Sequence, residues 1–580
     1  MKRVVELNGC WRFAPTLDQR PWNNHNITQS SLPLYASPEL CRRDWERVSV
    51  PGVWQRYAEK YSIYEGVCWY CREFALDSLD GVDAARLRFE GVNYRADVYL
   101  NGIPAGCHES GYTEFFLDVS DMLRAGENFI AVRVDNRPLI MKWPNDWGYF
   151  NYGGIHRGVS LQLFGGDYID ALETTPELDP VTGDGLLHLR GSVCGKGPVV
   201  VALDGRVDEL RPVSGRFDAV LRYPGVSPWS PESPSLSRLT VSIGGCTQLD
   251  CAVGFRHLEA RGGRVLLNGR ETRLNGCCYV FDSPESGLVM TREQLMADLA
   301  EMKAANVNAI RTHYPMDEKF YELCDEMGFL VWIEPNVYCC KPAAEETGTF
   351  FSRPDSVETA RGMMREMISS ARRFAGVAFY GIGNECNVEH PEAMPFFREL
   401  SAIARAADPT RLIGFAALYG LTGEIPDIVD VLGINSYFGW YDRISAINRF
   451  ERIEPQNGSV RVDAVELSGF HALMEDVFGR IPSDMPVLLT EFGGDSIPGC
   501  FSSANDLWSE NYHAAVVSSM IAASREYDNI SGTFVFAFTD YLDPSKPRNG
   551  FWREQNLKGM LTFNRDRKLP FYALRDAYAK

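Results

Sequence analysis

Residues 377–385 read Val-Ala-Phe-Tyr-Gly-Ile-Gly-Asn-Glu, and residues 486–491 read Pro-Val-Leu-Leu-Thr-Glu. Each is a short apolar run that ends in a carboxylate, Glu385 in the first and Glu491 in the second. Such runs are typical of strands that are buried on both faces in a parallel sheet. A carboxylate at the end of a buried strand is costly unless it has a partner or a task. The two runs therefore predict a barrel-like sheet whose mouth carries acid/base and nucleophilic groups.

The region around these runs, residues 258–580, alternates short apolar strands with amphipathic helices, which is typical of a parallel βα fold. Strand ends are expected near Tyr279, His313, Glu334, Glu385, Leu418, Tyr437, Glu491 and Asp540. Helices are expected between most of them, among others at 291–306, 317–328, 355–374 and 505–527. This pattern predicts a (β/α)₈ TIM barrel, with Glu385 and Glu491 at the C-terminal ends of its fourth and seventh strands, where such barrels carry their active sites.

The first part of the chain is rich in strands and poor in helices. Residues 85–90 and 96–100 alternate or run apolar, and Asn101-Gly102 then supplies a tight hairpin turn. A further strand is expected at 128–134, after a turn that contains glycine. We expect a β-sandwich of the jelly-roll type over residues 1–167.

Residues 168–257 contain shorter strands that are separated by glycine and proline. Examples are 198–203 and 237–243, and a proline-rich loop at 224–234 lies between them. The size and pattern predict an Ig-like β-sandwich as the second domain.

The composition limits the classes of partner. The chain has 580 residues, 45% of them hydrophobic and 23% charged, which is ordinary for a globular protein of several domains. The net charge of −19 disfavours nucleic acid and anionic membranes, because both require clustered cations. The N-terminal residues lack the apolar core of a signal peptide, and no uninterrupted apolar run is long enough to span a membrane. We therefore expect a cytoplasmic protein.

The fifteen cysteines are expected to be free thiols, because no export signal accompanies them. Cys68 and Cys71 have the spacing of a redox or zinc pair, but they lie in a strand-like stretch, where residues three apart face opposite sides. The nine histidines form no cluster with ligand spacing. We therefore expect buried structural cysteines and no metal site.

The two strand-end carboxylates admit two interpretations. A lone glutamate in such a place is more often the partner of a buried arginine. Two of them on non-adjacent strands of one barrel face a shared pocket, where one must be ionised and the other protonated. The acid is the one whose pKa burial and the second negative charge raise. Carboxyl groups about 5 Å apart suit double displacement at an anomeric carbon and a wider gap suits inversion, and the sequence leaves both open.

The motifs that surround these residues resemble glycoside hydrolase family 2, the group of β-galactosidases, β-mannosidases and β-glucuronidases. Asn384-Glu385 resembles the acid/base motif of the family, and Thr490-Glu491-Phe492-Gly493 resembles its nucleophile motif. Further family motifs are matched, in the same order along the chain, by residues 68–74, 98–102, 151–157, 254–256, 267–269 and 308–315. The similarity covers nearly the whole chain.

The resemblance implies a role for each matching residue. Glu385 is implied to be the general acid/base and Glu491 the nucleophile, while Asn384 bonds the sugar 2-hydroxyl and Tyr437 orients the nucleophile. Further substrate-binding positions implied by the resemblance are Asn435, Tyr441, His313 and Asp146, the last somewhat out of register with the sandwich aspartate that reaches the sugar in β-glucuronidases.

The choice of sugar depends on Asn556-Leu557-Lys558-Gly559, which resembles the Asn-x-Lys motif that holds the substrate carboxylate in β-glucuronidases. An ammonium group and an amide donor bind a uronate by charge-assisted hydrogen bonds. The alternative is a solvated loop lysine, because lysine is mostly exposed in proteins. The motif favours uronate binding by Asn556 and Lys558.

We therefore predict a retaining exo-β-glucuronidase that acts on a small-molecule or oligosaccharide β-glycoside. A β-galacturonidase or a β-galactosidase stays open, because residues 279–282 and Phe534, which stands where the family has tryptophan, depart from the family at substrate-facing positions. A carbohydrate-binding protein without turnover is the third interpretation. Chemistry that needs only carboxylates and water implies no metal or organic cofactor. The resemblance implies a homo-oligomer.

Overall fold

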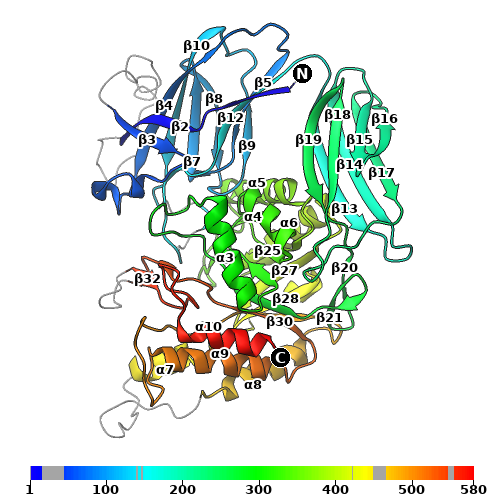
Figure 1. Ribbon diagram of the computed structural model, residues 1–580. Coiled ribbons are helices and arrows are strands. Elements are labelled where there is room, and N and C mark those ends of the chain that lie inside the picture. The colour runs from blue at the N-terminus through cyan, green and yellow to red at the C-terminus, as the bar shows by residue number, and fades with distance from the viewer. Residues whose placement is uncertain are drawn as a thin grey trace.

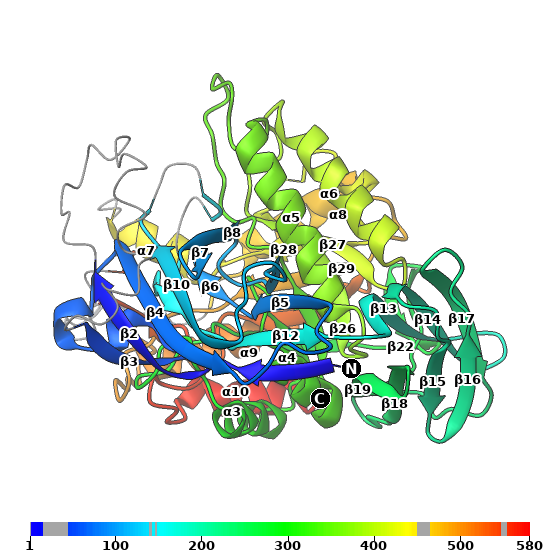
Figure 2. The same ribbon diagram turned by 90° about the horizontal axis from the view of Figure 1, so that it is seen from above.

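The computed structural model describes residues 2–15, 45–138, 142–144, 148–420, 422–448, 465–546 and 554–580, without the side chains of 445–448. Two β-sandwiches lie above a barrel in Figure 1, the N-terminal one at the left and the second at the right. The view in Figure 2 shows the same separation from above. The predicted architecture of a jelly-roll sandwich, an Ig-like sandwich and a TIM barrel is confirmed. We retain 1–167, 168–257 and 258–580 as the proposed domain boundaries.

The N-terminal sandwich consists of two antiparallel sheets. One sheet has the order β1 (Lys2–Glu6), β12 (Val159–Phe164), β5 (Ala84–Phe89), β9 (Phe115–Asp118). The other has the order β3 (Glu46–Val50), β2 (Gly9–Pro15), β4 (Val67–Leu76), β10 (Gly126–Asp135), β7 (Arg95–Leu100), β8 (Ile103–Glu109). The predicted hairpin joins β7 to β8, and Asn101 and Gly102 have φ values of 54° and 82°. Positive φ at both turn residues is what a two-residue hairpin loop requires, and Asn-Gly adopts it readily.

The second sandwich packs a three-stranded sheet against a four-stranded sheet. Their orders are β13 (Tyr168–Leu178), β14 (Gly185–Cys194), β17 (Arg216–Tyr223) and β16 (Arg206–Leu210), β15 (Val199–Leu203), β18 (Ser237–Ile243), β19 (Cys246–Val253). Alternate residues of both sheets are buried between them, as in β15 and β18, so the period-2 pattern of the sequence forms an Ig-like core. A small sheet of β20 (Leu258–Arg261), β21 (Arg264–Leu267) and β22 (Arg270–Glu271) follows.

Eight parallel strands close into a barrel. They are β23 (Leu274–Cys278), β24 (Ala309–Arg311), β25 (Leu330–Ile333), β26 (Val377–Asn384), β27 (Leu412–Leu418), β28 (Val431–Asn435), β29 (Val487–Phe492) and β30 (Ile530–Val535). Seven of the predicted strand ends lie within two residues of the observed ends. The eighth is wrong, because β30 ends at Val535 and not near Asp540. The apolar run continues past the strand because Ala537 and Phe538 are buried beneath residues 556–561, with Ala537 N–H donating to the Lys558 carbonyl at 3.1 Å.

Helices cover the barrel. They are α3 (Arg292–Ala304), α4 (Glu318–Met327), α5 (Pro354–Ala371), α6 (Ala393–Ala407), α7 (Tyr441–Asn448), α8 (Ser468–Arg480), α9 (Glu510–Ser524) and α10 (Leu569–Tyr578). Thr291 caps α3 in a capping box, and Asp317 caps α4. The predicted helix 505–527 begins later than expected, because Ser509 accepts the Tyr512 N–H and fixes the start of α9. Of the helices described, none is long and apolar enough to cross a membrane.

The cysteine prediction needs one correction. Cys68 and Cys71 lie on β4 and pack into different apolar clusters on its two sides, as the strand periodicity predicts. Of the cysteines in the described part of the chain, thirteen, including Cys68, are free thiols, but Cys71 is disulfide-bonded. The expectation of free thiols is therefore wrong for Cys71, because strand periodicity excludes only a bond within this pair.

The N-terminal sandwich reaches the mouth of the barrel and supports a loop there. Phe150 N–H donates to the Leu542 carbonyl at 2.9 Å, and Leu542 N–H donates to Asp282 Oδ2 at 3.0 Å. Asp282, which follows β23, also accepts a hydrogen bond from Tyr152 of the sandwich at 2.9 Å. The sandwich therefore fixes β31 (Tyr541–Leu542) at the mouth of the barrel. β31 pairs in turn with β32 (Gln555–Asn556).

Candidate active site

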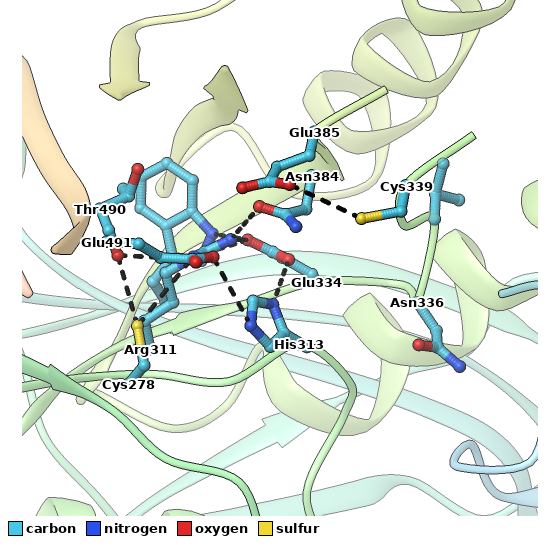
Figure 3. A network of polar contacts seen from close by, with 12 residues as sticks. Cys278, Arg311, His313, Glu334, Asn336, Cys339, Asn384, Glu385, Thr490 and Glu491 are labelled. Carbon is cyan, nitrogen blue, oxygen red and sulfur yellow. Dashed lines mark hydrogen bonds and ion pairs between the residues drawn. The ribbon is translucent and has the colours of Figure 1, made fainter. Parts of the chain in front are cut away.

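A cavity of about 210 Å³ opens at the C-terminal end of the barrel, and both strand-end glutamates line it. Glu491 belongs to β29, and Glu385 follows β26 directly. Glu385 has a φ of 50°, in the left-handed region that a residue with a side chain rarely adopts. Such a conformation costs about 1–3 kcal/mol and persists where the surrounding structure enforces it. The turn at Glu385 directs its carboxyl group into the cavity, and Figure 3 shows the groups around it.

The carboxylate of Glu491 is held at both oxygens. Arg311 Nη1 donates to Oε1 at 2.7 Å, and the Tyr437 hydroxyl donates to Oε2 at 2.7 Å. Burial raises the pKa of Tyr437 well above its ordinary value, and the Glu491 carboxylate adds to that rise, so the phenol stays a donor. His313 Nε2 lies 3.7 Å from Oε1. These contacts hold the carboxyl group of Glu491 in one orientation, as a nucleophile requires.

Arg311 connects Glu491 to Glu334 and Asn384. Besides Glu491, its guanidinium donates to Glu334 Oε1 at 2.9 Å and to Asn384 Oδ1 at 2.7 Å, as Figure 3 shows. Burial alone would raise the pKa of Glu334, but Arg311 and His313 outweigh burial and hold the pKa below its usual range. Trp332 Nε1 adds a hydrogen bond to Glu334 at 2.7 Å. Glu334 is therefore an ionised structural partner of Arg311, and the glutamate of the cavity that is free to carry a proton is Glu385.

The carboxyl group of Glu385 has a different environment. Its Oε1 accepts from Asn435 Nδ2 at 2.9 Å, while Lys341 Nζ lies 3.4 Å and Cys339 Sγ 3.7 Å from Oε2. Burial raises the pKa of Glu385, and the negative charge of Glu491 raises it further. A glutamate whose pKa is raised in this way is suited to act as a general acid near neutral pH.

Asn384 presents an unsatisfied donor. Its Oδ1 accepts from Arg311 and from Asn435, the latter at 3.0 Å, so its Nδ2 must point the other way. Thr490 Oγ1 donates to Asn435 Oδ1 at 2.8 Å, which fixes that amide in turn. Nδ2 of Asn384 is buried and has no protein partner among the described residues. A buried amide without a partner is costly, and a ligand hydroxyl in the cavity would satisfy it.

Lys558 and Asn556 line the same cavity. Lys558 is buried, pairs with Asp495, and lies 4.8 Å from the ring centre of Tyr441. Burial would lower the pKa of Lys558, but Asp495 and Tyr441 outweigh it and raise the pKa above its ordinary value. Lys558 therefore stays charged, and the solvated loop lysine is excluded.

A second ammonium group lies close by. Lys546 Nζ lies 3.2 Å from the Tyr441 hydroxyl, so Tyr441 separates the two lysines of the cavity. Asp543 faces the same space and accepts from Asn556 Nδ2 at 3.2 Å. Burial raises the pKa of Asp543. This wall therefore combines two cations with amide and phenol groups, and it suits an anionic part of a ligand.

Comparison with known proteins identifies the family. The protein-family model of the TIM barrel domain of glycosyl hydrolases family 2 matches residues 258–580. The family model of the sugar binding domain of the same family matches residues 4–164. The chain belongs to glycosyl hydrolase family 2. It is therefore a glycoside hydrolase, and the resemblance inferred from the motifs is confirmed.

Relatives of this family 2 hydrolase include proteins that are named for three different activities. A β-glucuronidase of Paenibacillus borealis is 24% identical, over 100% of this chain and 97% of its own. A β-galactosidase of Priestia megaterium is 28% identical over 71% of this chain, which matches only 44% of that relative. The crystal structure of a β-galacturonidase from Eisenbergiella tayi, bound to galacturonate, has a TM-score of 0.81 at 26% identity and covers 100% of this chain and 97% of that one.

The structure brings most of the predicted site residues of the hydrolase together. Glu385, Glu491, Asn384, Tyr437, Tyr441, Asn556, Lys558 and His313 line the cavity, and Asn435 supports it through Glu385 and Asn384. Asp146 lies outside the described residues. Phe534 is buried within the barrel, whereas Phe536, two positions further on, is one of the aromatic residues that line the cavity.

Sequence reasoning missed several groups around the cavity. Arg311 and Glu334 were noted only as part of a motif and as a strand end, although their strand-end positions indicated a place at the mouth. Lys341, Asp495, Asp543 and Lys546 lie in loops, and their spacing gave no such indication. Within the described residues no three histidine, cysteine or acidic side chains are grouped as metal ligands.

Proposed function

We propose that this family 2 hydrolase is a retaining exo-β-glucuronidase, which hydrolyses terminal β-D-glucuronides through a glycosyl-enzyme intermediate. The observation that carries the proposal is the charged, buried Lys558 beside Asn556 in the cavity that Glu385 and Glu491 line. Catalytic carboxylates select no sugar, whereas a buried ammonium at the wall of the cavity favours a substrate with a carboxylate.

In the first half of the reaction, an oxygen of the Glu491 carboxylate attacks the anomeric carbon. Glu385 donates its proton to the glycosidic oxygen as the bond from that oxygen to the anomeric carbon breaks. Arg311 and Tyr437 orient the nucleophile by their hydrogen bonds to its two oxygens. The leaving group departs as the neutral alcohol, and the sugar stays esterified to Glu491.

In the second half, Glu385 acts as the base. Once Glu491 is an ester, its negative charge no longer raises the pKa of Glu385, which stays ionised and accepts a proton from water. The resulting hydroxyl attacks the anomeric carbon and displaces Glu491 as a carboxylate. Two inversions leave the configuration of the sugar unchanged.

Asn384 is proposed to bind the 2-hydroxyl of the sugar. Its Nδ2 is buried and has no protein partner among the described residues, and Arg311 and Asn435 fix the orientation of the amide. A hydrogen bond to the 2-hydroxyl that strengthens in the oxocarbenium-like transition state contributes to the rate, not only to binding.

Lys558, with Lys546 and Asn556, is proposed to bind the uronate carboxylate. Asp495 offsets the charge of Lys558, and the Lys558–Asp495 pair is buried. Asp543 would repel the ligand as a carboxylate, but burial raises its pKa and favours its neutral form, which repels the ligand less. Lys546, which lies beside the hydroxyl of Tyr441, supplies a second positive charge for the uronate carboxylate.

A β-galacturonidase or β-galactosidase is the second candidate. The named relatives include both activities, and a galacturonide would use the same carboxylate contacts and differ at the 4-hydroxyl. Rates on matched aryl β-glucuronide, β-galacturonide and β-galactoside substrates decide among the three. A β-glucuronide that is not the fastest of them would overturn the proposed sugar.

We also propose a cytoplasmic location and a homo-oligomeric state, which cell fractionation and light scattering of the purified protein would test. A carbohydrate-binding protein without turnover is the remaining alternative. Sugar binding without hydrolysis of any aryl glycoside would favour that alternative over an enzyme.

A further inference from the structure

Lys341 contacts the candidate acid/base residue from outside the barrel strands. It lies in the segment between β25 and α5, and its Nζ is 3.4 Å from Glu385 Oε2. Its side chain is 46% exposed, while that of Glu385 is 15% exposed. Among the described residues, the ion-pair partner of Glu385 is Lys341 alone.

The two oxygens of Glu385 face donors of different strength. Oε1 accepts from Asn435 Nδ2 at 2.9 Å, and Thr490 holds that amide in place. The contacts to Oε2 are longer, with Lys341 Nζ at 3.4 Å and Cys339 Sγ at 3.7 Å. We therefore assign the proton of the acid form to Oε2, the oxygen with the longer contacts.

The other groups that face Glu385 do not stabilise its ionised form by charge. Glu491 on β29 repels it, and burial keeps the neighbouring thiol of Cys339 and the phenols of Tyr338, Tyr419 and Tyr437 uncharged by raising the pKa of each group. Asn435 contributes only a neutral donor. Burial and the charge of Glu491 both raise the pKa of Glu385, and among the described residues Lys341 supplies the positive charge that counteracts this rise.

We propose that Lys341 is a positioning residue that strengthens Glu385 as a general acid, by stabilising the carboxylate that remains on Oε2 after proton transfer. The inference rests on the proposed acid/base role of Glu385, and it is independent of which sugar is bound. As the proton passes from Oε2 to the glycosidic oxygen, the negative charge that appears on Oε2 is met by the ammonium of Lys341. When water later returns a proton to Oε2, that ion pair is broken again.

The pH profile of kcat/KM tests this proposal. Its alkaline limb reports the ionisation of the free enzyme's acid. Lys341→Gln removes the charge, so we expect that limb to move up by about 1 pH unit, because an opposite charge at this distance lowers a carboxyl pKa by about that much. Lys341→Arg should leave the limb close to its wild-type position. Lys319→Gln is the matched control, because Lys319 on α4 has a similar exposure and pairs with Asp317, the N-cap of that helix.

A series of leaving groups supplies a second readout. Aryl glycosides with good leaving groups need little protonation, whereas alkyl glycosides need the acid fully. Lys341→Gln should therefore slow alkyl glycosides about threefold to tenfold more than nitrophenyl glycosides. An unmoved limb, or an equal loss on both kinds of substrate, would overturn the role of Lys341. Glu385→Gln in the same assays separates the two claims, because an alkaline limb that survives this change would disprove the acid role of Glu385 itself.

Discussion

Arg311 and Glu491 form an ion pair of 2.7 Å in which both side chains are nearly inaccessible to solvent. The same guanidinium also pairs with Glu334 and donates to Asn384, so one buried cation holds both the Glu491 carboxylate and the Asn384 amide. Charges buried to this extent are tolerated only when each is paired. The buried charges therefore stabilise one another as a network, and removing one of them leaves the others buried without a partner.

Arg311→Met is expected to destabilise the protein and abolish activity. It leaves Glu334 and Glu491 buried without their cation, at a cost of about 3–5 kcal/mol. Urea denaturation followed by fluorescence measures the loss. Arg190→Met, which breaks the exposed pair with Asp218, is the control and should leave the unfolding midpoint near that of the wild type. Equal midpoints for both variants would contradict the network.

Glu385→Ala should lower kcat/KM for alkyl glycosides by about 10²–10⁴, the contribution of a positioned acid/base group. Azide should restore turnover of an activated aryl glycoside, because a small anion then attacks the intermediate without a base. Nuclear magnetic resonance identifies the product, which is expected to be the β-glycosyl azide. An α-configured azide would show that Glu385 is not the acid/base of a double displacement.

Tyr437→Phe removes one of the two hydrogen bonds that orient Glu491. A hydrogen bond to a charged group contributes about 1.5–3 kcal/mol, so kcat should fall roughly 10- to 100-fold. The trapping rate of a fluorinated glycoside, which reports formation of the intermediate, measures this loss directly. Tyr527→Phe, whose hydroxyl contacts His471 between α8 and α9, serves as the control. A rate unchanged by Tyr437→Phe would exclude the orienting role.

Lys558→Met should reduce kcat/KM for an aryl glucuronide roughly 10- to 100-fold more than for the matching neutral glucoside, because only the uronide loses a charge-assisted bond. The single change leaves Asp495 buried without its cation, so Asp495→Asn/Lys558→Met is made as well, to separate selectivity from stability. If both variants lose equal rates on both substrates, Lys558 does not select the uronate.

The raised pKa of Asp282 is expected to make the protein less stable as the pH rises. Burial raises its pKa to about 6, above the unfolded value of about 3.9. Its contribution to stability is therefore fully present below about pH 4 and is lost as the pH rises through 6. Asp282→Asn removes this dependence. The unfolding free energy of the variant minus that of the wild type should therefore increase by about 1–3 kcal/mol from pH 4 to pH 8. A constant difference over that range would show that Asp282 titrates normally.

The barrel and its two glutamates could be predicted from the sequence because both depend on local pattern. Residues 377–383 are apolar up to the polar residues that end the run, and a run of this kind that alternates with helices is most simply a buried strand. The prediction failed at Asp540, where an equally apolar run is buried by a neighbouring loop after the strand has ended. Periodicity reports burial, and it does not report which element causes the burial.

The sequence by itself determined the order of the domains, the family and the identity of the two carboxylates, because each is encoded in residues that are close along the chain. Only the tertiary structure gave the two carboxylates different environments, in which burial and the charge of Glu491 raise the pKa of Glu385. Glu385 and Glu491 differ in their neighbours, Asn435 and Lys341 for one and Arg311 and Tyr437 for the other, and these come from separate strands and loops. A pKa is set by burial and by charges within a few ångströms, and that environment exists only once the barrel has closed.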